Sequence, residues 1–250
     1  MKQLFTIVCF LAGALSIYHY SGGEPLPVDL NILPSAGLAT PVQKGWEPLF
    51  DGKDMRQWRQ TGNDSMPGAG WVIKNGTLSV LPGRKGGDII TRKKYSDFEL
   101  VFDFKLTVGA NSGIKYRVNP IENSQTKKTS MMGIEYQIID DTNYPEIKDD
   151  PNGLSSAGSA YLLYAPVGKK LLPAGEWNHG RIVVKGKYAE HWLNGVKVAS
   201  YTKGTADFNE RLGKTKFKDY PDYAKADNGY IMLTDHGDQV YFKDIKIKAL

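Results

Sequence analysis

The sequence predicts an all-β fold of the sandwich type. Apolar and polar residues alternate along many short segments, which is the period-two pattern of a strand with one buried face. Two Asn-Gly pairs, Asn75 with Gly76 and Asn194 with Gly195, separate such segments, and both residues of a tight hairpin turn need positive φ. About a dozen short strands are expected. A single segment, residues 207–213, resembles a helix.

The segments expected to form the sandwich follow one another along the chain. Residues 98–108 alternate almost without a break, so they are expected to form a long strand with one buried face. The helix is expected to begin with a capping box of Asp207 and Glu210 and to end at Gly213. The other strands are expected at residues 71–80 and 191–198, as hairpins, and at 111–117, 133–141, 229–234 and 240–248.

The first twenty residues are expected to be a signal peptide or an N-terminal anchor. Lys2 precedes an apolar run over residues 4–17 that contains the single cysteine, Cys9. This run has the length and flank of an export signal and is short for a spanning helix. Residues 21–44 form a Pro/Gly-rich tether, so residues 45–250 are the one expected domain. We therefore expect an exported protein, periplasmic or extracellular, with no membrane span in its mature form.

Length and composition restrict the class of protein. A chain of 250 residues with 41% hydrophobic residues can form one large core, and 24% charged residues exclude an integral membrane protein. The 32 basic and 27 acidic residues are interspersed along the chain. Because no Lys/Arg block of the kind found in nucleic-acid arms is present, no nucleic-acid partner is expected. The oligomeric state stays open.

Two neighbouring segments, 111–117 and 133–141, carry polar residues on one face. Lys115 and Arg117 alternate with apolar residues in the first segment, and Glu135 and Gln137 do so in the second. The apolar faces are expected to join the core. The polar faces are either ordinary solvated surface or part of a site.

Several familiar site types are missing from the sequence. It has no Gly-rich phosphate loop before a helix, no cysteine pair, no His-Glu-x-x-His and no Gly-x-Ser-x-Gly. His236 follows an apolar strand and is a candidate acid or base, although a histidine that bonds a turn backbone explains it equally well. For His191, on a hairpin strand, packing is the favoured explanation.

Acidic residues raise the question of a metal. Asp140, Asp141 and the stretch 149–153 offer oxygen ligands of the sort that a divalent cation such as Ca²⁺ prefers. Turn-forming aspartates explain them as well, so a bound cation is the minority interpretation. The long irregular stretches 142–159 and 202–228 are of a kind that often carries function.

Six ordered motifs resemble the 3-keto-disaccharide hydrolase family. They are Asn-Ser-Gly-Ile-x-x-Arg from 111, Gly-x-Glu-Tyr-Gln-Ile-x-Asp from 133, Gly-Glu-Trp-Asn from 175, Glu-His-Trp-Leu-Asn-Gly from 190, Lys-Phe-x-x-x-Pro from 216 and Asp-His-Gly-x-x-Val-x-Phe from 235. The resemblance covers about Trp46 to Leu250. It implies a concanavalin A-like jelly-roll sandwich of two antiparallel sheets. It also implies an exported enzyme that cleaves glycosidic bonds of 3-keto sugars.

The resemblance also implies one carbohydrate pocket. The residues that it places there are Asn111, Arg117, Glu135, Gln137, Asp141, His191, Lys216, Asp235 and His236. We add Lys115, because a cation can polarise a ketone oxygen. Tyr161 is added because its ring suits stacking on a sugar.

The spacing of carboxylates argues against an ordinary glycosidase. Such enzymes use two nearby carboxyl groups, and the next carboxylate on the face of Glu135 is Asp141, about 20 Å away along an unbent strand. A 3-keto sugar needs no such pair, because its ketone acidifies the hydrogen on C2 and permits elimination. We expect Glu135 and His236 to serve as base and acid, in either order. Lys115, Arg117 or a cation would polarise the carbonyl. The alternative is a lectin-like module that binds glycans without turnover.

Overall fold

The computed structural model describes residues 8–11, 14–17, 45–83 and 86–250. Within the N-terminal part, β1 (Val8–Leu11) pairs with β2 (Ala14–Ile17) as a short antiparallel hairpin. Most of the expected export segment and all of the expected tether lie outside the described residues, so both stay predictions. Among the helices that are described, none is long and apolar enough to cross a membrane.

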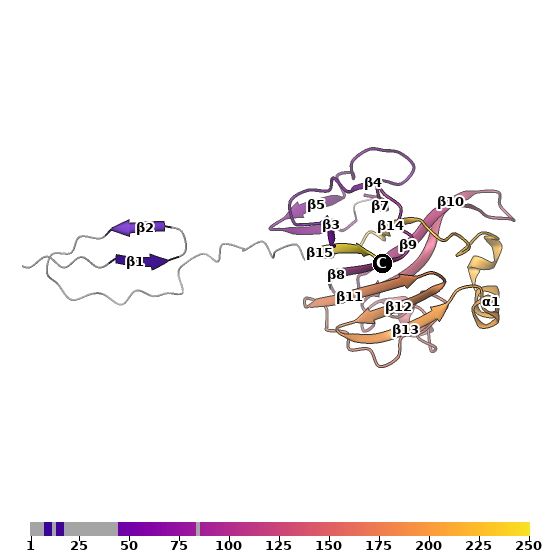
Figure 1. Cartoon of the computed structure of the whole chain (residues 1–250). Helices are drawn as coiled ribbons and strands as arrows, with labels where there is room; N and C mark the ends of the chain where they lie inside the picture. The colour runs from indigo at the N-terminus through magenta and orange to yellow at the C-terminus, as the bar shows by residue number, and fades with distance from the viewer. Residues whose placement is uncertain (1–7, 12–13, 18–44, 84–85) are drawn as a thin grey trace, which may run out of the picture. The chain divides into compact units, whose positions relative to one another are not determined.

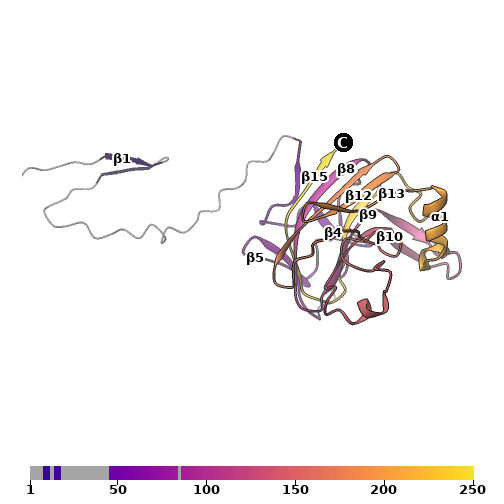
Figure 2. The ribbon, with the colours of Figure 1, turned by 90° about the horizontal axis from the view of Figure 1, so that it is seen from below.

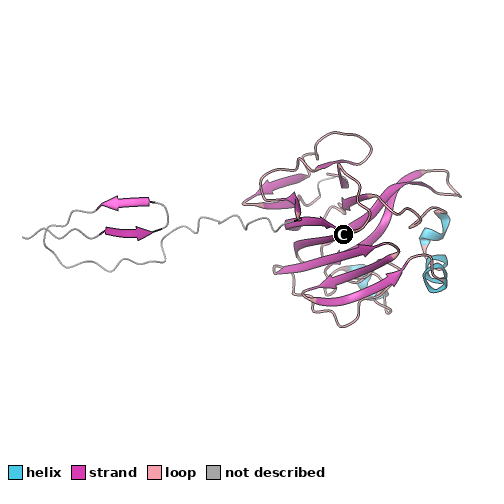
Figure 3. Ribbon diagram, in the orientation of Figure 1, coloured by secondary structure: helices cyan, strands magenta, loops and turns pink. Residues whose placement is uncertain are grey.

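The domain that begins near residue 45 consists of two antiparallel sheets, as Figures 1 and 3 show. The five-stranded sheet contains, in spatial order, β10 (Thr129–Ile139), β9 (Asn111–Glu122), β14 (Tyr230–Leu233), β7 (Ile89–Thr91) and β4 (Trp58–Gln60). The eight-stranded sheet contains β13 (Val196–Thr202), β12 (Tyr188–Leu193), β11 (Trp177–Lys185), β8 (Phe98–Leu106), β15 (Val240–Ala249), β6 (Thr77–Val80) and β5 (Trp71–Lys74), with β3 (Glu47–Phe50) paired to β15. The expected jelly-roll sandwich is confirmed.

The hydrophobic core lies between the two sheets. Along β8 every second residue is buried, and Phe102 and Phe104 are fully so. The five-stranded sheet supplies Ile114 and Tyr136 to the same cluster. The rings of Phe102 and Tyr136 meet edge to face, with centroids 5.3 Å apart. The alternation in the sequence therefore identifies the inward face of these strands correctly.

The turns and the helix follow local sequence rules with one difference. Both Asn-Gly pairs form hairpin turns with positive φ, 51° and 73° at Asn75 and Gly76 for example. The N-cap of helix α1 (Ala206–Gly213) lies two residues earlier than expected, because Thr205 takes this position and its side chain accepts a hydrogen bond from the Phe208 amide at 3.3 Å. The predicted capping box of Asp207 and Glu210 is therefore wrong.

Two short 3₁₀ helices complete the domain, η2 (Pro145–Asp149) and η3 (Lys216–Asp219). Figures 1 and 2 both place α1 at the end of the sandwich beside β10, and η3 follows α1 directly. The stretch 202–228, which is irregular in the sequence, thus contains the helical segments at this end.

A β-bulge at Arg117 interrupts the alternation of β9. Arg117 has a φ of 53°, and together with Val118 it lies opposite the single residue Gly133 of β10. A bulge reverses the face to which the following residues point. Val118 therefore packs with Ile90 and Met232 in a small cluster separate from the main core. Arg117 leaves the polar face that the sequence assigned to it.

The close crossing of β11 and β8 yields a test of the core. Gly180 pairs with Phe102, and a Cβ at Gly180 would lie 2.2 Å from the Phe102 ring. We expect Gly180→Ala to lower the free energy of unfolding by about 1–3 kcal/mol, because the ring must shift in a packed core. Gly213→Ala is the matched control, since nothing lies within 4 Å of its Cβ position. Urea unfolding measures both, and equal stability of the two variants would contradict the packing.

Candidate functional site

A pocket of about 530 Å³ lies over the five-stranded sheet. This volume is in the range of about 300–1,000 Å³ typical of small-molecule sites. Strands β9 and β10 form its floor, and η3 and the loops around Tyr161 and His236 form its walls. Its lining residues are Asn111, Lys115, Asn123, Met132, Gly133, Glu135, Gln137, Tyr161, Lys216, Phe217, Asp219, Tyr220 and His236.

Glu135 is the central residue of the floor. It pairs with Lys115 across β9 and β10, so both side chains point to the same face of the sheet. The Lys115 Nζ lies 3.8 Å from Glu135 Oε2. The carboxyl group lies over Gly113, where a Cβ would come within 2.2 Å of Oε1. Glycine at position 113 is therefore required for this placement.

The carboxyl group of Glu135 is in an unusual environment. Glu135 is only 6% exposed, and no donor in the described part of the chain bonds its Oε1. Burial raises the pKa of this carboxyl, while the nearby Lys115 and His236 oppose the rise. A carboxyl with a raised pKa in a pocket can take up and release a proton closer to neutral pH than an ordinary glutamate.

An amide pair closes one end of the floor. Gln137 is 3% exposed, and its Nε2 donates to Asn111 Oδ1 at 3.2 Å. The backbone amide of Asn111 donates to Asp238 Oδ2 at 3.0 Å, which ties the first residue of β9 to the loop after β14. Both amide side chains are thereby fixed where they line the pocket.

His236 is exposed on the loop after β14 and lines the same pocket. The preceding residue, Asp235, holds this loop in shape. Its carboxylate accepts from the Gly87 amide at 2.9 Å and from the Gly237 amide at 2.8 Å, and its own amide donates to Asp88 at 2.9 Å. Asp235 thus positions the histidine and does not line the pocket, in contrast to its predicted contact with substrate.

Tyr161 and Lys216 form a wall above the floor. The Tyr161 amide donates to the backbone oxygen of Glu135 at 3.0 Å. The Lys216 Nζ lies 4.9 Å from the centre of the Tyr161 ring and 3.4 Å from its hydroxyl oxygen. The wall is therefore attached to the floor through the backbone, and it presents both a ring and a cation.

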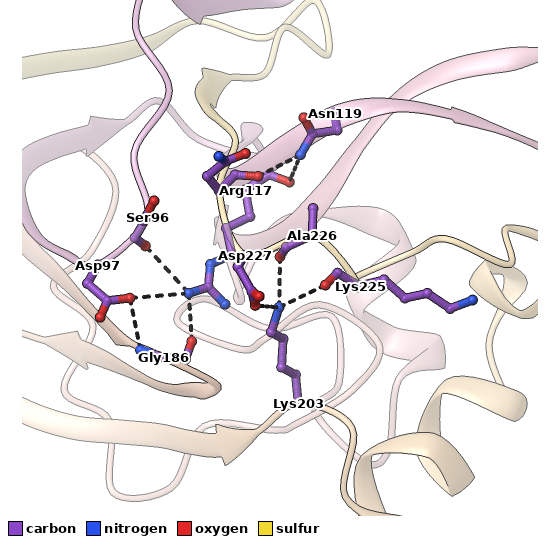
Figure 4. Close-up of polar contacts among 10 residues, drawn as sticks. Ser96, Asp97, Arg117, Asn119, Gly186, Lys203, Lys225, Ala226 and Asp227 are labelled. Carbon is purple, nitrogen blue, oxygen red and sulfur yellow. Dashed lines mark hydrogen bonds and ion pairs between the residues drawn. The ribbon is translucent and has the colours of Figure 1, made fainter.

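Arg117 does not lie in the pocket, where the sequence predicted it. Its Nη2 donates to the Gly186 oxygen at 2.6 Å and lies 3.6 Å from Asp97 Oδ1 (Figure 4). Because the β-bulge turns it from the polar face, Arg117 binds loops of the other sheet and is absent from the pocket lining. It cannot polarise a substrate bound over Glu135.

His191 does not lie in the pocket either, in contrast to what the family resemblance implied. Its side chain is fully buried in the core, where Nδ1 donates to the Gly158 oxygen at 3.1 Å and Nε2 accepts from the Tyr116 hydroxyl at 2.9 Å. The Tyr116 hydroxyl in turn bonds that of Tyr201. Burial lowers the pKa of His191 to about 4. The ring is neutral and supports the segment that leads to Tyr161.

Asp141 belongs to a different part of the surface. Its carboxylate accepts from the Ala157 amide at 2.9 Å and pairs with Lys169 at 2.5 Å. Two further candidate cation ligands act in turns, because Asp140 accepts from the amides of residues 109, 142 and 143 and Asp150 from that of residue 155. No group of three or more His, Cys, Asp or Glu side chains in the described chain could hold a metal ion. The cation that these residues suggested stays a prediction.

Six of the residues that line the pocket were not predicted from the sequence. They are Asn123, Met132, Gly133, Phe217, Asp219 and Tyr220. Three of them come from residues 217–220, inside the long irregular stretch 202–228, so the irregularity was the available signal. Asn123 and Met132 lie near the β9–β10 turn, and no pattern in the sequence distinguishes them.

Comparison with known proteins places the chain in a family. Residues 45–248 match the sequence model of a family described as the 3-keto-alpha-glucoside-1,2-lyase-like domain. The chain belongs to this family. It is 29% identical over 237 residues to a 3-keto-disaccharide hydrolase of Bacteroides thetaiotaomicron, covering 85% of this chain and 81% of the relative.

Solved structures extend the family likeness to the fold. Two crystal structures from Parabacteroides distasonis, each described as a "putative glycosyl hydrolase", are 35% and 30% identical. Each match covers 82% of this chain and, in turn, 94% and 99% of the two solved chains. The TM-scores are 0.72 and 0.61. Family and relatives together support a carbohydrate-active hydrolase.

The burial of Glu135 predicts a pH-dependent stability. Burial holds its folded-state pKa above the ordinary value of 4.5, so between these two values the folded state binds more protons than the unfolded state. The free energy of unfolding then falls as pH rises. We expect the stability of Glu135→Gln relative to the wild type to increase as the pH rises from 4 to 8, as measured by urea unfolding. The exposed Glu176→Gln is the control. If the difference in stability between Glu135→Gln and the wild type stays the same across this pH range, the burial of the Glu135 carboxyl is contradicted.

His191 predicts the opposite pH dependence. The unfolded chain protonates this residue near pH 6.5 and the folded chain only near pH 4, so the unfolded state binds more protons within this window. The contribution of this group to the free energy of unfolding is fully present above pH 6.5. It is lost as pH falls, and the loss amounts to about 3 kcal/mol. Wild type should therefore lose more stability than His191→Gln between pH 7 and pH 4. Equal losses would show that the imidazole is not held neutral.

Proposed function

We propose that this chain cleaves the glycosidic bond of 3-keto-disaccharides or 3-keto-glycosides by elimination followed by hydration. The proposal is supported by family membership, by the relative named 3-keto-disaccharide hydrolase and above all by the setting of Glu135. A single buried carboxyl with a raised pKa faces a lysine across the strand pair, and a histidine lines the same pocket. This set matches the needs of a ketone-assisted elimination.

The first half-reaction is an elimination. Glu135, on the floor, takes the proton from C2 of the keto sugar, and the electrons of that C–H bond form the C1–C2 double bond. Lys115, beside Glu135, stabilises the negative charge that develops on the ketone oxygen. The C1–O bond breaks, and the leaving oxygen receives a proton from His236. The products are an unsaturated 3-keto sugar and the free second sugar or alcohol.

The second half-reaction is a hydration. Water adds to C1 of the unsaturated ketone, His236 takes the proton that the water loses, and Glu135 returns its proton to C2. The net change is hydrolysis, and both residues end in their starting states. We assign the base to Glu135 because it lies beneath the ring with a raised pKa. The acid is assigned to His236 because it is exposed at the rim, where water enters.

Incubation with 3-keto-trehalose in D₂O tests this proposal. We expect the full-length chain to release glucose and to place solvent deuterium at C2, as measured by mass spectrometry. Glu135→Gln should lose both activities by about 10²–10⁴-fold, the usual contribution of a general base. His236→Ala should slow release of glucose by a similar factor but retain some exchange at C2.

The control and the contrary outcomes are specific. His179→Ala is the matched control, because His179 is exposed on the eight-stranded sheet and pairs with Asp103 at 2.8 Å. Release of glucose without deuterium at C2 would overturn the elimination. Binding of 3-keto-trehalose that yields no glucose and survives in both site variants would favour the lectin-like alternative.

A further inference from the structure

The outer face of the eight-stranded sheet, on the other sheet from the pocket, is rich in tryptophan. Its strands β13, β12, β11, β8 and β15 lie side by side (Figure 1). Trp177 of β11 and Trp192 of β12 take outward positions between buried neighbours, and Trp46 lies beside Lys248 of β15, 5.2 Å from its Nζ. Three of the five tryptophans of the chain are thus on or beside this face. Tryptophan is enriched at binding surfaces and is uncommon on a merely solvated one.

Two lysines lie over the ring of Trp177. The Lys105 Nζ is 5.0 Å from the centre of this ring and 4.8 Å from that of Tyr241. The Lys243 Nζ is 4.5 Å from the same Trp177 ring. Trp177, Lys105 and Tyr241 are direct neighbours on β11, β8 and β15, so the strand register sets this arrangement. The rings attract the ammonium groups and thereby hold two positive charges close together at the surface.

The same arrangement recurs at Trp192. The Arg181 guanidinium lies 4.8 Å from the centre of its ring and the Lys197 Nζ 6.0 Å from it. Both cations are cross-strand partners of Trp192, on β11 and β13. Arg181 follows Trp177 by four residues on β11, which is about 13 Å of strand. The face therefore presents two separate units, each a tryptophan ring under two cations.

Positive charge exceeds negative charge on this face. The outward positions of the five strands, with the bulge in β15 included, hold seven cations and four carboxylates. They are Lys105, Arg181, Lys185, Lys197, Lys243, Lys246 and Lys248 against Glu99, Asp103, Glu190 and Asp244. The formal charge of +3 that results is more than half of the +5 of the whole chain. The excess attracts anionic partners.

The carboxylates are shared and do not cancel this charge. Glu99 accepts from Arg181 at 2.6 Å and also pairs with Lys248 at 3.1 Å. Asp103 pairs with His179 at 2.8 Å and with Lys243 at 3.8 Å. Within the described part of the chain, no carboxylate lies within 4 Å of the Lys105 ammonium group. The cations above Trp177 therefore retain positive charge for an external anion.

Three features favour an anionic polysaccharide over other polyanions. Single-stranded nucleic acids stack their bases on aromatic rings, but cations already lie over both tryptophan rings of this face. Insertion into a bilayer needs protruding apolar groups, and Tyr188 is the one large hydrophobic residue described on these five strands that is exposed. Carboxylates such as Glu99 stand among the cations, where they accept hydrogen bonds from sugar hydroxyls and repel a continuous phosphate backbone.

We propose that the outer face of the eight-stranded sheet is a binding surface for an anionic polysaccharide. Acidic groups of the polymer pair with Lys105 and Lys243 above Trp177, and with Arg181 and Lys197 above Trp192. The surface is formed by the sheet that does not carry the pocket, so it is a second site and does not depend on the proposed function. A polymer bound there leaves the pocket open to its substrate.

Two polymers with the same backbone test the proposal: polygalacturonate, which is acidic, and its fully methyl-esterified form, which is neutral. Each is immobilised, and binding of the full-length chain is measured by biolayer interferometry. We expect binding to polygalacturonate only. This binding should weaken strongly when the NaCl concentration is raised from about 0.03 M to about 0.3 M, because salt screens exposed charges. Equal binding to the neutral polymer would overturn the proposal.

Variants locate the surface. Lys105→Met combined with Lys243→Met should raise the Kd for polygalacturonate about tenfold, since each exposed ion pair contributes a few-fold. Trp177→Leu should raise it about two- to fivefold, because the ring that holds both ammonium groups is lost. Trp177→Phe keeps a ring and should retain most of the affinity, which separates the role of the ring from that of packing.

Lys214→Met combined with Lys218→Met is the matched control, because it removes the same charge from two exposed lysines away from this face. Its Kd should equal that of the wild type, and a tenfold rise would reveal nonspecific attraction and overturn the surface. Glu135→Gln should also bind as the wild type does, since loss of binding there would place the polymer in the pocket. Tighter binding to single-stranded DNA or to phosphatidylserine vesicles than to polygalacturonate would overturn the assignment to a polysaccharide.

Discussion

The pairing of β9 with β10 is the constraint on which the site depends. Its register sets Lys115 opposite Glu135, and because side chains alternate between faces, a slip by one residue would bury both and expose the core. Gly113 then gives the Glu135 side chain room beside the neighbouring strand. The loop with Tyr161 adds to the outer edge of β10 through backbone hydrogen bonds with Glu135 and Gln137. The floor and the Tyr161 part of the wall are thus joined by backbone hydrogen bonds.

Period-two patterns predicted the fold and the floor of the pocket, but not every site residue. Alternation places Lys115, Glu135 and Gln137 correctly, because their strand segments are regular. Arg117 departs from it, because a bulge at a non-glycine residue with positive φ has no signature in a single sequence. His191 shows the reverse case. Its spacing from the buried Ala189 and Leu193 already indicated an inward side chain, and the family motif alone suggested a pocket residue.

The walls of the pocket were the least predictable part. Asp219 and Tyr220 stand in a segment without periodicity, so only the tertiary contacts of η3 bring them over β10. Asp141 shows that the sequence pattern also placed one residue at the pocket that does not belong there. An unbent strand would carry it along the face of Glu135, but β10 ends at Ile139, and the chain then turns so that Asp141 meets Lys169. Strand ends and loop paths depend on contacts between segments distant in sequence.

Both sheets depart from strand regularity, but the five-stranded sheet does so at the pocket. The eight-stranded sheet alternates throughout strand β8, yet its register shifts between His191 and Trp192 and between Lys243 and Lys246, where Asp244 has a φ of 51°. The five-stranded sheet contains the buried carboxyl of Glu135 and the strand glycine at position 113, both at the floor of the pocket. Each of these lowers stability locally, and natural proteins accept such costs mainly at functional sites. The burial of Glu135 therefore points to the same surface as the pocket does, independently of any likeness to other proteins.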